Sequence, residues 1–371
     1  MNNSIIYVGM DVHTSNYTLT CFSLDKDDCF ATVQVAPDVK NILKYLKRVE
    51  ENLGYECHFI CGYEAGCLGY SLYNQLKKNN IECIIMAPTS LPAIRNEIKT
   101  DRRDAEKLAK CLAFKSYSPV HIPNEHDNAI KDFIRMRDDV KAELKRAKQH
   151  LIALCLREGL IYKSTNYWTK THIEWLRKLK FSNYVLEETF NEYLLHITQL
   201  IQKVERLDNR IEELSKEEKY LEKVNRLCCF MGISRHTALS LIVETGDFKR
   251  FKKAQNYAAF LGLVPGESSS GNTIQRLGIT KAGNTHLRRL LVESAQSVTK
   301  INIHVKSRKM QQKQINNSPE IIAYADKANI RMKKKYIRMT QYNNIKSNIA
   351  KTAIARELAC FVWGMMNDKI Y

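Results

Sequence analysis

The order of short apolar runs at the start of the chain restricts the possible folds more than any other feature of the sequence. Each strand-like run is rich in β-branched and aromatic residues, and the stretches between the later runs repeat their apolar residues with a helical period. The resulting order, β-β-β-α-β-α-β, predicts a mixed sheet that is flanked by helices. The predicted strands cover residues 5–10, 17–23, 30–35, 58–63 and 82–86, and the predicted helices cover 39–53 and 68–79.

Two acidic residues stand at the ends of these predicted strands. Asp11 ends the first apolar run, and Glu64 directly follows the run at 58–63. Ligands bind at strand ends in such sheets, so the two carboxylates are candidates for one shared site. Further along, Asp101 and Asp104 lie three residues apart, a spacing that places both on one face of a helix.

Four carboxylates in this arrangement predict a metal site. Mg²⁺ prefers oxygen ligands, and two such ions can activate an attacking oxygen and stabilise a leaving oxygen in phosphodiester chemistry. Each residue alone has a structural alternative. Asp101 could cap the helix, and Glu64 could lie in a surface loop. Asp104 could pair with Arg103 or Lys107, but the set of four favours the metal site.

The charge of the chain is divided unevenly. Residues 1–125 hold 14 basic and 15 acidic residues, whereas residues 126–371 hold 44 and 25. This excess favours a nucleic acid as partner over a membrane, because no stretch reaches the ~18 uninterrupted apolar residues of a spanning helix. A basic surface that is merely solvated is the alternative. Pro119 and Pro123 predict a boundary where the charge changes.

The cysteines and the N-terminus indicate a compartment. The 11 cysteines include no paired CxxC elements, and most lie in apolar runs, as small buried side chains do. The N-terminus lacks the charged region and the long apolar region of a secretory signal. We therefore expect a protein of the reducing cytoplasm.

A heptad pattern lies in the long helical stretch that is predicted from about residue 128. Ile197, Val204 and Ile211 recur every seven residues, and a second series is offset by three. This seam predicts a helical hairpin or coiled coil that pairs protomers, and packing of the same seam within the chain is the alternative. The second series consists of Leu200, Leu207, Leu214 and Leu221.

The C-terminal part contains two candidate phosphate-binding features. Gly232-Ile-Ser before residues 237–244 resembles the hairpin of helix-hairpin-helix modules, although a glycine before a helix is most often just a turn. Residues 276–371 hold 19 basic and 5 acidic residues and are predicted to be helical and to face phosphates. This stretch includes Lys333, Lys334 and Lys335.

Three consecutive serines occupy the centre of a loop at 262–283 that is rich in glycine, serine and threonine. A serine hydroxyl is a poor nucleophile at its ordinary pKa, so it requires a base, a metal or a cationic surround. Nearby positive charge could also clamp a phosphate. The alternative is a flexible phosphate-binding loop whose hydroxyls only donate hydrogen bonds. The cationic residues are Arg276, Lys281, Arg288 and Arg289.

Six short motifs are spread over nearly the whole chain. They are Tyr7-Val-Gly-Met-Asp11-Val, Tyr63-Glu64-Ala-Gly, Lys99-Thr-Asp101-Arg-Arg-Asp104-Ala, Gly262-Leu-Val-Pro-Gly-Glu-Ser-Ser-Ser-Gly271, Gly278-Ile-Thr-Lys-Ala-Gly-Asn284 and Leu287-Arg-Arg-Leu. Together they resemble the DEDD transposases of bacterial insertion sequences, the IS110 group. One departure is Ala-Gly-Cys after Glu64, where relatives commonly have a small residue and threonine, and it affects packing more than chemistry.

The resemblance implies a RuvC-like, RNase H-type N-terminal domain, a helical coiled-coil linker that dimerises, and a mainly helical C-terminal transposase domain with a serine. It also implies recombination that is guided by a bridge RNA, which pairs with donor and target DNA while the protein reads shape and backbone. The family's serine directly precedes a glycine, which here is Ser270 before Gly271. Ser268 and Ser269 remain alternatives, because the length of the loop varies in the family.

We therefore interpret the chain as an α/β plus α protein of a bacterial mobile element, associated with the nucleoid, that cleaves and exchanges DNA strands. The predicted domains are residues 1–125, 126–226 and 227–371. Mg²⁺ on the four carboxylates would activate Ser270, and we expect a dimer, or a tetramer on DNA. One alternative is a Mg²⁺-dependent junction nuclease in which water attacks, and another is a nucleic-acid-binding protein that no longer cuts. Nucleic-acid contacts are expected from Arg102, Arg103 and the basic residues named above.

Overall fold

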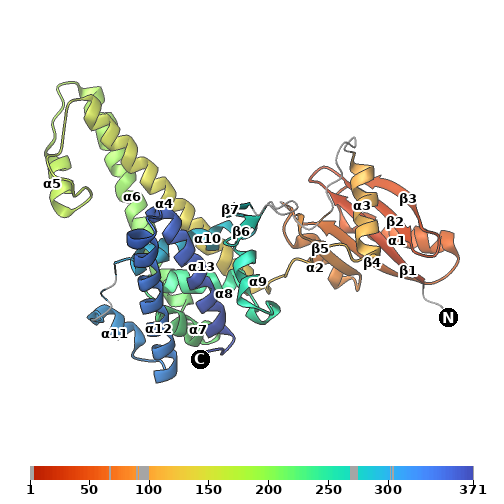
Figure 1. Cartoon of the computed structure of the whole chain (residues 1–371). Coiled ribbons are helices and arrows are strands. Elements are labelled where there is room, and N and C mark those ends of the chain that lie inside the picture. Colours follow the sequence, from red (N-terminus) through yellow and green to blue (C-terminus); the bar gives the residue numbers. More distant parts are fainter. Residues whose placement is uncertain are drawn as a thin grey trace. The chain divides into compact units, whose positions relative to one another are not determined.

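The computed structural model describes residues 4–66, 68–88, 91, 100–267, 275–300, 302 and 305–370. The chain divides into two compact units, residues 1–122 and 123–371 (Figure 1). Unit 1 is a sheet with helices on both faces, and unit 2 is almost entirely helical. The fold class predicted from the sequence is confirmed.

Unit 1 is built on a five-stranded sheet. Its strands are β1 (Ser4–Val12), β2 (Tyr17–Ser23), β3 (Asp28–Val35), β4 (Cys57–Glu64) and β5 (Glu82–Met86). The strand order is β3-β2-β1-β4-β5. β2 is antiparallel to both of its neighbours, whereas β4 is parallel to β1 and to β5. This is the mixed sheet that the order of apolar runs predicts, and two of the strands have the predicted bounds.

Helices cover both faces of the sheet (Figure 1). Alternate side chains of β1 pack in one core with α1 (Val39–Leu53) and α2 (Ser71–Lys78). On the other face Tyr7 packs in a second core with residues of α3 (Asp101–Ala113). Successive side chains of a strand point to opposite faces, so Gly9 and Asp11 share the α3 face with Tyr7.

Two glycines allow α3 to lie very close to this face. Gly9 and Gly62 are partners in the parallel register of β1 and β4. A Cβ atom on Gly9 would lie 2.0 Å from the carbonyl oxygen of Ala105 and 2.3 Å from the backbone nitrogen of Ala109. A Cβ atom on Gly62 would lie 2.8 Å from the side chain of Leu112. The two missing side chains therefore set the distance between α3 and the sheet.

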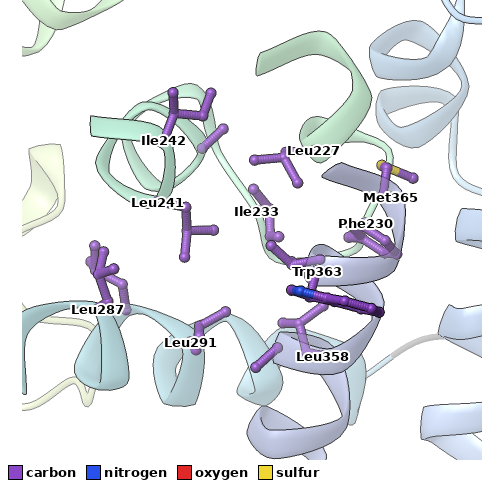
Figure 2. Close-up of a cluster of buried hydrophobic side chains, with 14 of the residues drawn as sticks. Leu227, Phe230, Ile233, Leu241, Ile242, Leu287, Leu291, Leu358, Trp363 and Met365 are labelled. Carbon is purple, nitrogen blue, oxygen red and sulfur yellow. The ribbon is translucent and has the colours of Figure 1, made fainter. Parts of the chain in front are cut away.

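Unit 2 has one large hydrophobic core, to which helices distant in the sequence contribute. Figure 2 shows Leu227, Leu241, Leu291 and Trp363 converging in this core. The helices are α4 (Glu125–Arg157), α5 (Lys170–Lys178), α6 (Tyr184–Leu214), α7 (Glu218–Cys228), α8 (Arg235–Thr245), η2 (Phe248–Arg250), α9 (Ala254–Phe260), α10 (Thr285–Val298), α11 (Arg308–Gln314), α12 (Pro319–Ile337), η3 (Arg338–Tyr342) and α13 (Ser347–Met366), and a hairpin consists of β6 (Pro265–Glu267) and β7 (Arg276–Ile279). Among the described helices, none combines the length with the apolar composition that a membrane span requires.

The heptad seam lies on α6 and is used within the chain. α6 packs beside α4, and Ile197, Leu200 and Leu207 are buried in a core that both helices form. Ile211 and Leu214 continue the seam into the large core. Leu221 belongs to α7 and is 38% exposed. Of the two interpretations of the seam, packing within the chain is therefore the one that accounts for these buried side chains, and the oligomeric state stays a prediction.

The connection between α7 and α8 has the form of a hairpin between two helices. Gly232 has a φ of +85°, and Ser234 caps α8 by accepting a hydrogen bond from the backbone N–H of Thr237. A Cβ atom on Gly232 would lie 2.3 Å from the carbonyl oxygen of Ser294 in α10. The glycine is therefore required by this turn and by its close packing against α10.

Candidate active site

The ends of β1 and β4 bring two carboxylates to one edge of the sheet. Met10 and Tyr63 are the last paired residues of the parallel register, and Asp11 and Glu64 follow them directly. Each acid lies two residues beyond one of the glycines that contact α3, so both are on the α3 face. Asp11 is half-buried and Glu64 is exposed.

The first turn of α3 supplies the other two carboxylates. Thr100 caps the helix, since its side-chain oxygen accepts a hydrogen bond from the backbone N–H of Arg103. Asp101 and Asp104 follow in the first turn. Ala105 and Ala109 lie against Gly9, so the first turn extends beyond Gly9 toward the strand end that carries Asp11. The cap at Thr100 replaces the capping role that Asp101 could have had.

Three possible metal ligands meet at this edge. Ligand atoms of Asp11, His13 and Asp101 all lie within 4.8 Å of one another. His13 Nε2 is 3.3 Å from Asp11 Oδ2. Burial raises the pKa of Asp11; His13 opposes this shift, and the charges of Asp104 and Asp101 add to it. The negative charge that gathers around Asp11 is what a divalent cation would neutralise.

This donor set fits a divalent metal ion. Carboxylate oxygens suit Mg²⁺ and Mn²⁺, and an imidazole is a ligand that Mn²⁺ and other transition metals accept. The structure brings Asp11 and Asp101 together as predicted and places Asp104 near enough to raise the pKa of Asp11. Glu64 lies at the neighbouring strand end. His13 was missed by sequence reasoning, although its position two residues after Asp11 is a visible signal.

The predicted serine nucleophile lies outside the described residues, as do Ser268 and Ser269. The two strands that flank this segment are described, and β6 pairs with β7. Below the strands the two ends of the loop meet, since the Lys281 N–H donates to the Gly262 carbonyl at 3.1 Å and the Asn284 N–H donates to the Phe260 carbonyl at 2.9 Å. The described flanks of this segment therefore form a hairpin with a closed base, which we call the serine hairpin (residues 262–267 and 275–283).

A buried carboxylate anchors the base of the serine hairpin. Glu244, at the end of α8, has a side chain that is 1% exposed. It accepts hydrogen bonds from Asn284 Nδ2 at 2.8 Å and from Arg135 Nη2 at 2.8 Å. Its Oε1 lies 2.6 Å from His286 Nδ1. Asn284 also caps α10, so Glu244 fixes the residue at which the hairpin ends and the helix begins.

The network continues from His286 to a second buried carboxylate, Asp138 in α4. His286 Nε2 lies 2.8 Å from Asp138 Oδ2, and Arg289 Nη2 donates to the same oxygen at 2.5 Å. Arg137 Nη1 donates to Asp138 Oδ1 at 2.8 Å. Burial alone would lower the pKa of His286, but its hydrogen bonds with Asp138 and Glu244 raise it to about 9. His286 is therefore an imidazolium held between two carboxylates, a network that no pattern in the sequence predicts.

The predicted basic residues differ in how they are used. Arg288 donates to the carbonyl oxygen of Leu261 at 2.9 Å, and Lys333 donates to the carbonyl oxygen of Thr299. The other described cations form ion pairs or extend from the surface. Arg102 pairs with Glu106, Arg289 with Asp138 and Lys335 with Glu357, whereas Arg103, Lys281 and Lys334 are exposed and the side chain of Arg276 is outside the described part.

Two family models match this chain. A DEDD transposase model of IS110 elements, described as "Transposase", matches residues 8–158, which include unit 1 from β1 onward and all of α4. A second, described as "Transposase IS116/IS110/IS902 family", matches residues 224–310, which include α8, the serine hairpin and α10. The two matches therefore contain both the acidic edge and the buried network.

Curated relatives agree with these matches. The transposase for insertion sequence element IS1533 of Leptospira borgpetersenii is 36% identical over 247 residues, which are 66% of this chain and 70% of the relative. A putative transposase, y4qE, of Sinorhizobium fredii is 33% identical over 316 residues, 85% of this chain and 76% of the relative. The transposase for insertion sequence element IS1111A of Coxiella burnetii is 27% identical over 60% of both chains. With an RNase H-like sheet that carries the acidic motif and a helical C-terminal unit, the chain belongs to the IS110 family of transposases, enzymes that transfer DNA phosphodiesters.

Proposed function

We propose that Asp11, Glu64, Asp101 and Asp104 hold Mg²⁺ and that Ser270 is the nucleophile in DNA strand cleavage by this transposase. The observation that supports the metal site is the meeting of Asp11 with Asp101 and His13, from two elements that are ninety residues apart in the sequence. When bound, Mg²⁺ would polarise the phosphate and favour the deprotonated form of the attacking hydroxyl.

The serine step balances without a nucleotide cofactor. Ser270 Oγ loses its proton and attacks phosphorus, a new P–O bond forms, and a deoxyribose oxygen leaves with a proton. In the reverse step a deoxyribose hydroxyl of the recombining strand displaces the serine. Cleavage exchanges a phosphodiester between two nucleotides for one between serine and DNA, and the reverse step exchanges it back, so the energy of the bond is conserved. The match of residues 224–310 to a transposase family model supports this role, because the matched range includes Ser270.

A guide RNA and a homo-oligomer complete the proposal. The surplus of 19 positive charges in residues 126–371 is large enough for the protein to hold both an RNA and DNA. A bridge RNA would supply sequence recognition, while the protein holds the backbones. Sequencing of RNA that copurifies with the protein tests the guide, and light scattering with and without DNA tests a dimer and a tetramer.

The metal assignment is tested with Mn²⁺ as a spectroscopic substitute for Mg²⁺. Asp11→Asn should weaken Mn²⁺ binding in an electron paramagnetic resonance titration and abolish strand cleavage, while DNA binding is retained. The control is Glu51→Gln, because Glu51 is a surface acid on α1 with a side chain that is 61% exposed. Full cleavage by Asp11→Asn contradicts the assignment.

The nucleophile is tested by trapping protein on a suicide DNA substrate and mapping the adduct by mass spectrometry. Ser270→Ala should eliminate the adduct, whereas Ser268→Ala and Ser269→Ala should retain it, since neighbouring hydroxyls point elsewhere. An adduct on Ser268 or Ser269 moves the assignment along the loop. Free 5′-phosphate ends without any adduct favour the junction nuclease, in which water attacks. Absence of cleavage under all conditions favours a binding protein that no longer cuts.

A further inference from the structure

We propose that a basic groove between α12 and α13 binds the phosphate backbone of duplex DNA. The groove has a volume of about 880 Å³. It is lined by five cations, one acid and one apolar side chain: Lys327, Arg331, Lys334, Lys335, Arg338, Glu357 and Ile330. Both helices belong to unit 2, so the groove is described within a single unit (Figure 1).

The cations form a stripe along α12 that ends at Arg338, the first residue of η3. Lys327, Arg331, Lys334 and Arg338 are all exposed, and they are spaced by four, three and four residues. This spacing places one cation on each turn of a single helix face, with roughly 5.4 Å between turns. The opposite face of α12 is buried in the core through small and apolar side chains, among them Ala325 and Met332. The stripe can therefore contact consecutive phosphates while the helix is held rigidly from behind.

One acid, Glu357, partly neutralises the positive charge of the groove. Glu357 in α13 has a side chain that is 9% exposed. Its carboxylate lies 2.7 Å from Arg331 Nε and 2.6 Å from Lys335 Nζ. It holds these two side chains at the wall of the groove. Because one acid cannot neutralise five cations, the groove keeps a net positive charge, which attracts an anionic partner.

The three consecutive lysines at 333–335 make different contacts. Lys334 is exposed in the stripe and Lys335 is paired with Glu357 at the groove wall. Lys333 is absent from the lining and donates a hydrogen bond to the carbonyl oxygen of Thr299. Of the three adjacent lysines that the sequence predicts as nucleic-acid contacts, Lys334 is thus the one best placed to meet a phosphate.

The partner with this chemistry is DNA. Transposases of this family act on DNA, and a linear stripe of cations fits the regular row of phosphates on one strand of a duplex. The single apolar residue, Ile330, is 37% exposed and offers no aromatic platform on which an unpaired base could stack. Phosphate contacts from such a stripe carry no sequence information directly. The surface would therefore bind DNA without regard to sequence.

The test is fluorescence anisotropy of the full chain with a labelled duplex of arbitrary sequence over a series of salt concentrations. Lys334→Ala should lower the slope of log K against log salt by about 0.9, the value expected for one lost phosphate contact. If the salt lines converge near 1 M, this is a loss of about 8-fold in affinity at 0.1 M salt. Lys333→Ala is the matched control and should leave the slope unchanged.

A gain-of-binding variant keeps the test informative if the alanine variant is less stable. Glu357→Gln removes the acid that pairs with Arg331 and Lys335, so affinity and salt slope should both increase. Equal effects of Lys333→Ala and Lys334→Ala would overturn the proposal, and so would unchanged binding by Glu357→Gln. A loss confined to a labelled RNA, with duplex DNA binding unchanged, would also overturn it. The assay requires neither metal nor cleavage, so its result is independent of the proposed serine and carboxylate roles.

Discussion

Glu244→Gln is the most direct test of the buried network at the base of the serine hairpin. The substitution keeps the shape of the side chain and removes its charge. Glu244 is 1% exposed and has three partners, Arg135, Asn284 and His286. The amide of glutamine has one acceptor oxygen, whereas the carboxylate has two. Its NH2 group would lie opposite side chains that are themselves hydrogen-bond donors. Arg135 and the imidazolium of His286 then compete for a single oxygen.

The expected cost follows from this loss of one buried charge. Removing one partner of a buried ion pair typically costs about 3–5 kcal/mol, because the other charge is left uncompensated. Here the cost should be near the lower end, about 3 kcal/mol, because Arg135 is 48% exposed and water can replace its partner. The pKa of His286, which is about 9 in the native protein, should fall by roughly one unit when one of its two carboxylates is gone.

Urea unfolding monitored by tryptophan fluorescence measures this cost. Trp168, Trp175 and Trp363 all lie in unit 2, so the signal reports on the unit that contains Glu244. The control is Glu293→Gln, because Glu293 is 56% exposed and pairs with Arg289 on the surface of α10. It should cost less than about 0.5 kcal/mol. A Glu244→Gln protein that unfolds like the control and titrates His286 near pH 9 would refute our account of the network.

Two further predictions concern backbone packing and pH. Gly9→Ala should destabilise unit 1 by about 3 kcal/mol and reduce strand cleavage, because the new methyl group would lie 2.0 Å from the carbonyl oxygen of Ala105. Hydrogen exchange of the β1 amides measures the loss of stability. The control is Gly66→Ala, because a Cβ atom there would have its nearest neighbour at 3.9 Å. Because the pKa of His286 is raised to about 9, protonated His286 stabilises unit 2 fully below about pH 6.5, and this stabilisation should be lost as the pH rises through about 9. Urea unfolding over this pH range measures the loss. A His286→Gln protein whose unfolding depends on pH as that of the unchanged protein does would contradict the prediction.

The sheet and the acidic edge could be predicted from the sequence because their signals are local. The bounds of β2, β5 and α1 coincide with the predicted ones, since each is a continuous apolar or amphipathic run between turn residues. Asp11 and Asp101 were placed together because a strand end and the start of a helix are each visible in a short stretch. His13 was not predicted, although it lies only two residues after Asp11, because a histidine just beyond a strand end is most often only part of the structure.

The buried network could not be predicted, because its partners are far apart in the sequence. Asp138, Glu244 and His286 come from three helices, and each alone reads as an ordinary polar residue on an amphipathic stretch. Only the packing of α4, α8 and α10 makes them neighbours. The heptad seam shows the converse problem, since a 3.5-residue repeat indicates that a helix has a partner but does not identify it. Here the partner is α4 of the same chain.

Copies of such an element can lose activity without losing any acidic residue. A substitution outside the acidic motif can have this effect by changing how α3 packs on the sheet. A copy with alanine at residue 9 would keep all four acids, yet its helix could not dock where Asp101 meets Asp11. Residue 9 therefore has to be examined together with the four acids when a copy is judged to be intact, although glycine contributes no side chain to the chemistry.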